Sequence, residues 1–210
     1  ETLKQAGIKF DVVFTSLLKR AIATNQLTLE ALGQSDLEVK QDWRLNERHY
    51  GALQGLDKKA TTLKYGVEQT NLWRRSFDVA PPPVDLSSPE HPRNDPRYRD
   101  ISPNDLPNTE CLKDVVARVV PFFNQHILGE LQNNKNVLIT AHGNSLRALV
   151  MHLENLSPEQ IAKFNIPTGV PRKYEFSNQM KLTAVGYLGD QVAIATAINT
   201  VSNQSNAENQ

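Results

Sequence analysis

The chain has 210 residues, of which 39% are hydrophobic and 22% charged, and its 23 basic residues balance 23 acidic ones. This length allows a substantial core and fits one domain of ordinary size. The zero net charge gives no indication of nucleic-acid or membrane binding, so anion binding must come from local clusters of Lys and Arg. A single cysteine, Cys111, excludes an intrachain disulfide. With no signal-peptide pattern and no apolar run of spanning length, we expect a cytoplasmic protein.

The N-terminal residues resemble the end of a helix. Glu1–Ala6 has the composition of a last helical turn, and Gly7 closes it. Removal of a tag or processing would also expose Glu1. Because a domain rarely begins on the last turn of a helix, we expect a further segment before Glu1 in the natural protein.

The first half of the chain alternates strand and helix patterns. A β-branched and aromatic run predicts a strand at Phe10–Thr15, and a 3.6-residue apolar period then predicts a helix that stops at Gly33. The remaining segments of this half are a short strand at Glu38–Lys40, a loop at Asn46–Gly55, a single helix at Asp57–Phe77 and a polar, proline-rich connection at Pro81–Pro107.

The second half begins with a helix at Leu112–Leu131, capped by Asn108 or Thr109 and kinked at Pro121. Val137–Ala141 is a continuous apolar run, as expected for a strand covered on both faces. Helices are predicted at Ser145–Leu153 and Asp190–Val201, and a third helix follows a capping box at Ser157–Gln160. Two more strands are predicted at Lys173–Phe176 and Leu182–Leu188. Residues 202–210 are rich in Asn, Gln and Ser, so we expect a domain over residues 1–201 and a disordered tail.

Strands that alternate with helices predict an α/β fold with a mostly parallel sheet. In such folds the ligand site lies beyond the carboxyl ends of the strands. Thr15–Arg20 and Ala141–Arg147 both follow predicted strands, and each carries a polar and cationic cluster. The search for chemistry therefore concentrates on these two segments.

His142 stands at the end of the Val137–Ala141 strand, before a glycine that permits a tight turn. The free N–H groups of the next helix favour an anion there. A buried histidine bonded only to backbone is the alternative, and the position at a strand end favours the functional reading. Ser145 lacks the Gly-x-Ser-x-Gly context of a nucleophile, so we expect it to cap the helix.

The loop Leu45–Gly51 gathers a carboxylate, a guanidinium, an imidazole and a phenol with little apolar content. Taken alone, this loop is also compatible with a solvated segment that holds an incidental ion pair. Arg74 and Arg75 follow Trp73, and one of two adjacent arginines on a helix commonly lies on the surface. Guanidinium groups nevertheless match phosphate and carboxylate oxygens, and a lysine such as Lys58 adds a point charge.

Longer motifs occur at Phe14-Thr15-Ser16-x-x-x-Arg20-Ala21, Arg44–Leu53, Leu72–Arg75, Ala141–Arg147 and Ile166–Pro171. Together they closely resemble the bisphosphoglycerate-dependent phosphoglycerate mutases of the histidine phosphatase superfamily. The resemblance spans roughly Lys4 to Val201. It implies an enzyme of glycolysis and gluconeogenesis that interconverts 3-phosphoglycerate and 2-phosphoglycerate through a phosphohistidine and 2,3-bisphosphoglycerate.

The same resemblance assigns roles to residues. Glu47 matches the proton donor and acceptor for the substrate hydroxyl, and His142 matches the residue that stabilises charge on the transferring phosphoryl group. Substrate-binding positions are matched by Arg20, Arg48, His49, Tyr50, Lys58, Arg74, Arg75, Gly143 and Asn144. The family suggests a homodimer or homotetramer. We expect no metal, because the other histidines, His91, His126 and His152, have no paired ligand spacing.

The family's nucleophilic histidine lies in an Arg-His-Gly motif after the first strand, and this chain contains no Arg-His-Gly. We expect that strand, its loop and most of a helix to precede Glu1, roughly forty residues by analogy with the family. In the family's three-layer sandwich the strand lies inside the sheet, between those that match Val137–Ala141 and Lys173–Phe176. Its loss leaves two unpaired inner edges and a poorly stable chain.

Three other readings stay open on the sequence. A bisphosphoglycerate synthase or phosphatase shares this kind of site and differs in the balance of its steps. A shortened, catalytically dead chain that only binds phosphoglycerate is the second. A structural relic without binding activity is the third.

Overall fold

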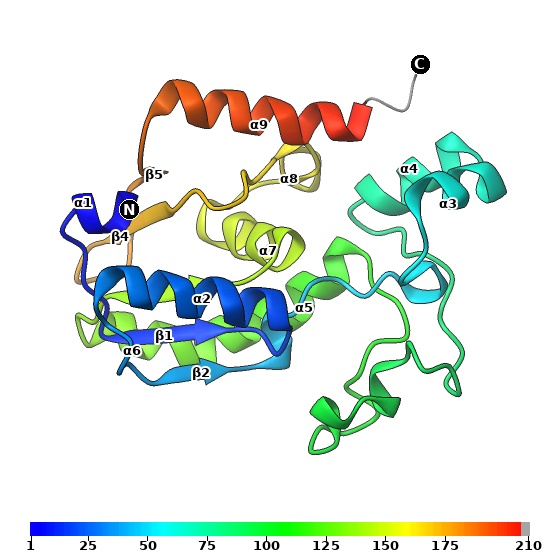
Figure 1. Cartoon of the computed structure of the whole chain (residues 1–210), viewed down its shortest axis with the longest axis horizontal. Helices are drawn as coiled ribbons and strands as arrows, with labels where there is room; N and C mark the ends of the chain where they lie inside the picture. Colours follow the sequence, from blue (N-terminus) through cyan, green and yellow to red (C-terminus); the bar gives the residue numbers. More distant parts are fainter. Residues whose placement is uncertain (207–210) are drawn as a thin grey trace.

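The computed structural model describes residues 1–206, apart from the side chains of residues 58–59 and 202–206. Three parallel strands form its main sheet in the order β2-β1-β3, with β1 (Val12–Thr15) between β2 (Val39–Gln41) and β3 (Val137–Thr140) (Figure 1). Val12 lies opposite Val137 in the register of β1 and β3. All three strands therefore end at the same edge of the sheet.

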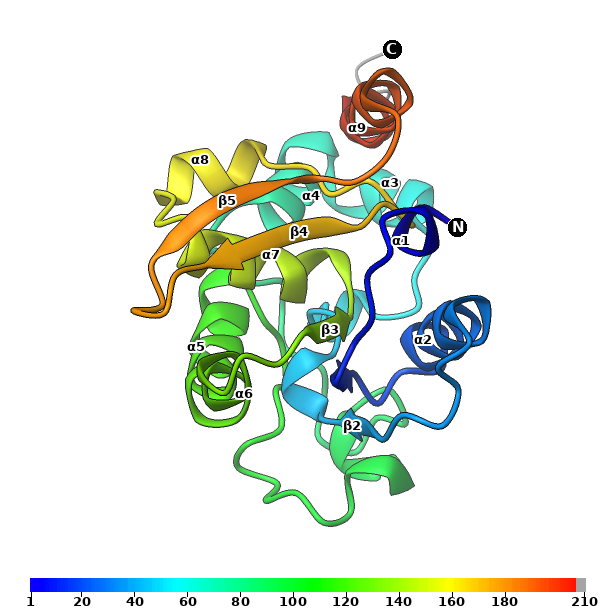
Figure 2. The ribbon, with the colours of Figure 1, turned by 90° about the vertical axis from the view of Figure 1, so that its left-hand side faces the viewer.

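Helices cover both faces of this sheet (Figure 2). Val13 of β1 packs with Leu29 of α2 (Lys19–Leu32), while Phe14 packs with residues of α5 (Leu112–Phe122) and α7 (Gly143–Leu153). Adjacent strand residues point to opposite faces, so one strand serves two cores. The predicted α/β fold with a mostly parallel sheet is confirmed, and the layers are α2, the sheet, and α5 with α7.

A second, two-stranded sheet lies over α7 (Figure 2). It consists of β4 (Arg172–Phe176) and β5 (Leu182–Tyr187), which pair antiparallel. Among the described residues β3 pairs only with β1 and β4 only with β5, so both carry the unpaired inner edge expected from the sequence. The chain then enters α9 (Gln191–Asn206), which crosses the top of Figure 1.

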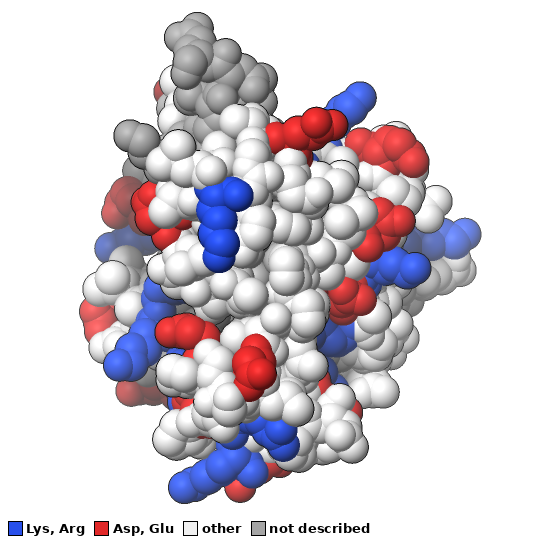
Figure 3. Space-filling view, turned by 90° about the vertical axis from the view of Figure 1, so that its right-hand side faces the viewer, with Lys and Arg blue, Asp and Glu red and all other residues white. Residues whose placement is uncertain are grey.

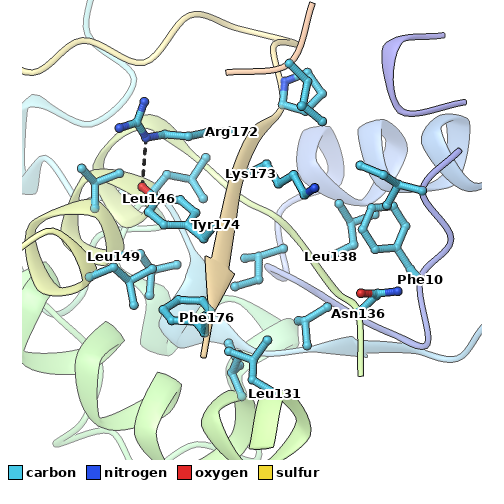
Figure 4. Close-up of a pocket in the computed structure, with 18 of the residues that line it drawn as sticks. Phe10, Leu131, Asn136, Leu138, Leu146, Leu149, Arg172, Lys173, Tyr174 and Phe176 are labelled. Atoms are coloured by element: carbon cyan, nitrogen blue, oxygen red, sulfur yellow. Dashed lines mark hydrogen bonds between the residues drawn. The ribbon is translucent and has the colours of Figure 1, made fainter. Parts of the chain in front are cut away.

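An apolar groove of about 310 Å³ lies between β3 and β4 (Figure 4). We call it the strand groove. Its wall includes Phe10, Leu138, Leu146, Leu149, Tyr174 and Phe176. The four residues of β3 are only partly buried, contrary to the prediction of a strand covered on both faces, because β3 borders this groove.

Glycine divides the predicted helix Asp57–Phe77 into α3 (Lys58–Tyr65) and α4 (Val67–Arg75). Gly66 between them has a φ of 82°, a left-handed conformation that interrupts a right-handed helix. The prediction of a single helix is therefore wrong.

The N-cap of α5 is Cys111, and the predicted caps are wrong. Asn108 Oδ1 bonds His91 Nε2 at 2.7 Å, and Thr109 Oγ1 donates to the Pro81 carbonyl at 2.8 Å. Both side chains thus anchor the proline-rich segment. The backbone N–H of Cys111 donates instead to Asp114 Oδ2 at 2.8 Å.

Pro121 lies inside α5, and a π-helical turn at Phe123–Ile127 follows, where the helix widens before α6 (Leu128–Gln132). At the other end of the chain, α9 continues five residues past its predicted end at Val201, because no Gly or Pro interrupts the helix up to Asn206. The helix thus includes residues 202–206 of the predicted tail, and residues 207–210 of that tail lie outside the described residues.

Shorter elements complete the fold. They are the helices α1 (Thr2–Gln5) and α8 (Pro158–Lys163), and 3₁₀ turns at Trp43–Leu45, Gly51–Leu53, Pro92–Asn94 and Pro96–Tyr98. In the part of the chain that the structure describes, no helix combines the length and apolarity of a membrane span. Figure 3 shows the face that includes α3 and α4, where positive and negative side chains are interspersed.

Candidate active site

The ends of β1 and β3 bring two polar side chains together. Ser16 follows β1, and its Oγ lies 2.7 Å from Nε2 of His142, which follows β3. Thr15 Oγ1 donates to the Thr140 carbonyl at 2.7 Å and locks the two strand ends to each other. The two predicted segments therefore do meet at one edge of the sheet, as parallel pairing requires.

His142 is the N-cap residue of α7 and is 6% exposed. Arg20 reaches it from the first turn of α2 and donates Nε–H to Nδ1 at 3.1 Å. Burial, and then the charge of Arg20, lower the pKa of His142 to about 4, so the ring is neutral at pH 7. Ser145 Oγ accepts the backbone N–H of His142 at 3.1 Å, which confirms its predicted capping role.

Glu47 faces the N-terminus of α7. Its Oε1 accepts the backbone N–H groups of Arg48 at 2.8 Å and Asn144 at 3.2 Å. A Cβ placed on Gly143 would lie 3.7 Å from Glu47 Oε2, so this glycine borders the carboxylate. The helix N-terminus and the loop thus hold one carboxylate beside His142.

Arg48 is 2% exposed, and its guanidinium stacks 4.4 Å from the centre of the Tyr50 ring. Its Nη2 donates to the Arg74 carbonyl at 3.3 Å, while its buried Nε has no hydrogen-bond partner. The Tyr50 hydroxyl accepts Nδ2 of Asn144 at 3.3 Å. A buried guanidinium with an unsatisfied N–H marks a place for an acceptor.

Positive charge is in excess around Glu47. Among the ion pairs of the described residues, none involves the guanidinium groups of Arg20, Arg48, Arg74, Arg75 or Arg147. Burial, and then neighbouring arginines, lower the pKa of Arg75 and lower that of Arg147 to about 10. The site is therefore suited to a ligand with phosphate or carboxylate oxygens.

A polar cavity of about 270 Å³ adjoins Arg20 and Arg48. Arg20, Glu47, Arg48 and Tyr50 line one side of it, and the proline-rich segment, including Tyr98, lines the other. This segment therefore forms a wall of the site.

Three predicted residues have other surroundings. The His49 ring accepts the Gly51 N–H at Nδ1 and bonds the Glu90 carbonyl through Nε2, both at 3.1 Å, and burial lowers its pKa. Arg74 is exposed and contacts Arg48 through its carbonyl. Lys58 belongs to α3, but the structure does not describe its side chain. Their substrate-binding roles stay predictions.

A buried ion pair that the sequence analysis missed holds the loop of Glu47 in place. Arg118 donates Nε–H to Glu110 at 2.6 Å, and its other nitrogens donate to the carbonyls of Arg44 at 2.6 Å and Asn46 at 3.1 Å. Glu110 Oε2 accepts the backbone N–H of His49 at 2.8 Å. The available signal was a charged residue on the apolar face of α5, three residues after Val115.

Among the described residues no group of three or more His, Cys, Asp or Glu side chains converges as a metal site.

The sequence matches the family model of the histidine phosphatase superfamily (branch 1) over residues 2–94 and 86–184. It is 51% identical over 202 residues to the 2,3-bisphosphoglycerate-dependent phosphoglycerate mutase of Borreliella burgdorferi (strain ZS7), a match that covers 96% of this chain and 82% of the relative. The enzyme of the same name from Xylella fastidiosa (strain M12) is 52% identical over 206 residues, with 98% and 83% covered.

Solved structures agree on the fold. Phosphoglycerate mutase from Bacillus anthracis str. Sterne superposes with a TM-score of 0.56 at 20% identity, covering 93% of this chain and 78% of that one. The alpha-ribazole phosphatase from Shigella flexneri superposes with a TM-score of 0.61 at 21% identity, covering 90% and 79%. With the sequence matches, these findings show that the chain belongs to the 2,3-bisphosphoglycerate-dependent phosphoglycerate mutases of the histidine phosphatase superfamily.

Proposed function

We propose that this site binds phosphoglycerates and that the protein interconverts 3-phosphoglycerate and 2-phosphoglycerate, with 2,3-bisphosphoglycerate as the source of a phosphohistidine. The observation that carries the proposal is the set of guanidinium groups without carboxylate partners around Glu47 and His142. A phosphate monoester carries a charge of about −1.5 to −2 at pH 7. Such a ligand compensates the buried positive charge.

The cationic and amide groups hold the substrate in this proposal. Guanidinium groups bind carboxylate and phosphate oxygens in pairs, and backbone N–H groups at the start of α7 donate to further anionic oxygens. The binding set is Arg20, Arg48, His49, Tyr50, Lys58, Arg74, Arg75, Gly143 and Asn144. Positioning of this kind supplies much of the rate in phosphoryl transfer.

Glu47 and His142 carry the chemistry that the chain itself contributes. Glu47 exchanges a proton with the substrate hydroxyl that gives or receives the phosphoryl group. His142 lies beside Glu47 at the start of α7, where negative charge on the phosphoryl oxygens has to be stabilised during transfer. Both groups lie against the N-terminal turn of α7.

The phosphoryl acceptor is a histidine at the end of a further strand, and the strand groove is the place for that strand. The groove is apolar and borders the unpaired edges of β3 and β4, and β3 leads directly to His142 (Figure 4). A strand that runs parallel to β3 there ends beside the site. Its sequence is the Arg-His-Gly segment of the family, preceded by apolar residues.

Two measurements test the proposed function. Isothermal titration of the 210-residue chain with 3-phosphoglycerate is expected to show binding, and no heat of binding would overturn the proposal. Incubation with 2,3-bisphosphoglycerate labelled on phosphate is expected to leave the chain unlabelled. A version extended by an apolar strand with Arg-His-Gly is expected to take up label that is acid-labile and stable to base, and an unlabelled extended version would overturn the strand assignment.

The extended version of the chain also tests two of the alternatives. The binding-only alternative predicts that the extended version binds phosphoglycerate without labelling. The synthase or phosphatase alternative is decided by the relative rates of the three reactions in that version. The predicted homodimer or homotetramer and the cytoplasmic location stay predictions.

A further inference from the structure

Ser16 lies in the candidate active site and is fully buried, with 0% exposure. It belongs to the Phe14-Thr15-Ser16 motif, and none of the roles derived above uses it. Its Oγ lies 2.7 Å from His142 Nε2 and also accepts the backbone N–H of Leu18 at 3.1 Å. Both contacts are made at the point where β1 ends.

The protons of the His142 ring follow from its partners. A guanidinium can only donate, so Nδ1, which receives Nε–H of Arg20, carries no proton. A neutral imidazole keeps one proton, and that proton is therefore on Nε2. Ser16 Oγ is the acceptor of this Nε2–H, since the tautomer assigned from the hydrogen-bond network leaves no other role for it.

We propose that Ser16 is a positioning residue that acts through His142. Its Oγ holds the Nε2–H donor in one orientation on the β1 side of the site, while Arg20 sets which nitrogen carries the proton. The inference rests on the proposed function, in which the His142 ring lies at the phosphoryl group. A ring that is held in one orientation needs no reorganisation when the phosphoryl charge develops.

The ladder between β1 and β3 makes this arrangement rigid. Ser16 is joined to β1, and β1 pairs with β3 from Val12 to Thr15. His142 is two residues beyond Thr140 and is fixed again as the N-cap of α7. The Oγ to Nε2 distance is thus set by the sheet rather than by a mobile loop.

A purely structural role makes a different prediction. Ser16 Oγ also satisfies Leu18 N–H two residues on, a local turn contact that stabilises the start of α2. If this were its whole role, loss of the hydroxyl would weaken folding and leave the His142 ring proton unaffected. The ring proton therefore separates the two roles.

The experiment follows the His142 Nε2–H by proton–nitrogen NMR on protein labelled with ¹⁵N-histidine. Assignment uses His142→Gln, which removes the signal. We expect a slowly exchanging Nε2–H signal in the wild-type chain, its loss to solvent exchange in Ser16→Ala, and its return in Ser16→Thr. Thr15→Val is the matched control, because it removes an equally buried hydroxyl one residue away that does not contact His142.

Affinity supplies the second readout. Titration with 3-phosphoglycerate is expected to show binding about tenfold weaker in Ser16→Ala, since one oriented hydrogen bond is lost, and unchanged binding in Thr15→Val. A persistent Nε2–H signal in Ser16→Ala, or an equal loss in Thr15→Val, overturns the proposal. The NMR signal needs no ligand, so a wild-type chain that shows it without binding 3-phosphoglycerate refutes the proposed function and leaves the Ser16 contact standing.

Discussion

The polar cavity at the strand ends and the strand groove are similar in size, about 270 Å³ and 310 Å³, and opposite in chemistry. The cavity is lined by charged groups such as Arg20, Glu47 and Arg48, whereas the groove is lined mainly by Leu, Ile, Val and aromatic side chains. β3 connects them, because its edge borders the groove and its end leads to His142. The comparison teaches that volume does not identify a site, and that the chemistry of the lining does.

The two regions also differ in how their polar atoms are satisfied. At the strand ends, buried groups such as Arg118 and Glu110 bond one another and the backbone. In the groove the unsatisfied groups are the backbone edges of two strands, which only another strand can fully pair. An anion fits the first region and a peptide strand fits the second.

The largest expected effect comes from Arg118→Met, which removes the charge that compensates Glu110. An uncompensated buried carboxylate costs about 3–5 kcal/mol, so the free energy of unfolding in urea falls by that amount. The double variant Arg118→Met/Glu110→Gln is the control and is expected to recover part of the loss. Equal stability of the wild type and Arg118→Met would show that the pair does not hold the loop.

Arg48→Met tests the polar cavity by binding. Charge-assisted hydrogen bonds are worth about 1.5–3 kcal/mol, so the affinity for 3-phosphoglycerate is expected to fall about 10- to 150-fold. Arg99→Met, at an exposed arginine that lies 3.5 Å from the Asp100 carboxylate, is the matched control and leaves the affinity unchanged. Similar losses in both variants would mean that net charge rather than the cavity attracts the ligand.

Leu146→Ala compares the packing of the strand groove with that of the closed core. Leu112, which is 1% exposed, lies in a packed cluster, and Leu112→Ala is expected to cost about 2–5 kcal/mol. Leu146 lines the groove and has fewer neighbours to lose, so Leu146→Ala is expected to cost less than about 2 kcal/mol in the same urea experiment. A loss as large as that of Leu112→Ala would mean that the groove is closed in solution.

A further test is a pH dependence set by His142. Its pKa in the folded chain is lowered to about 4, mainly by burial, and in the unfolded chain it is near the ordinary value of 6.5. The unfolded chain therefore binds more protons between these values, so this contribution is intact above about pH 6.5 and is lost as the pH falls towards 4. The thermal midpoint relative to that of His142→Gln is expected to fall by a few degrees over this window. A constant difference would contradict the buried neutral ring.

Elements with strong local signals were predictable from the sequence. Gly33 ends α2 with a φ of 68°, as expected from a glycine after a periodic run, and the Val137–Ala141 pattern located β3 to within one residue. The placement of Thr15–Arg20 and Ala141–Arg147 at strand ends, where the structure brings Ser16 to His142, followed from the rule for parallel sheets. These predictions depended only on local patterns and on one general rule of α/β folds.

Features decided by tertiary contacts were not predictable. Asn108 and Thr109 are good cap residues, yet the proline-rich segment binds their side chains and leaves the cap to Cys111. The Arg118–Glu110 pair joins a helix to a distant loop, and sequence periodicity carries no information about such a pair. The same limit applies to His49, whose ring is engaged by a segment 41 residues away.

The pairing of β1 with β3 has a consequence for folding during synthesis. The paired residues Val12 and Val137 are 125 positions apart, and an intervening segment of that length must be closed before the ladder forms. On the ribosome, β1 therefore emerges long before its partner, and Val13 and Phe14 await burial while most of the chain is still being synthesised. We expect nascent chains that do not yet include Val137 to depend on chaperones that shield apolar segments, because β1 then has no neighbour on the β3 side.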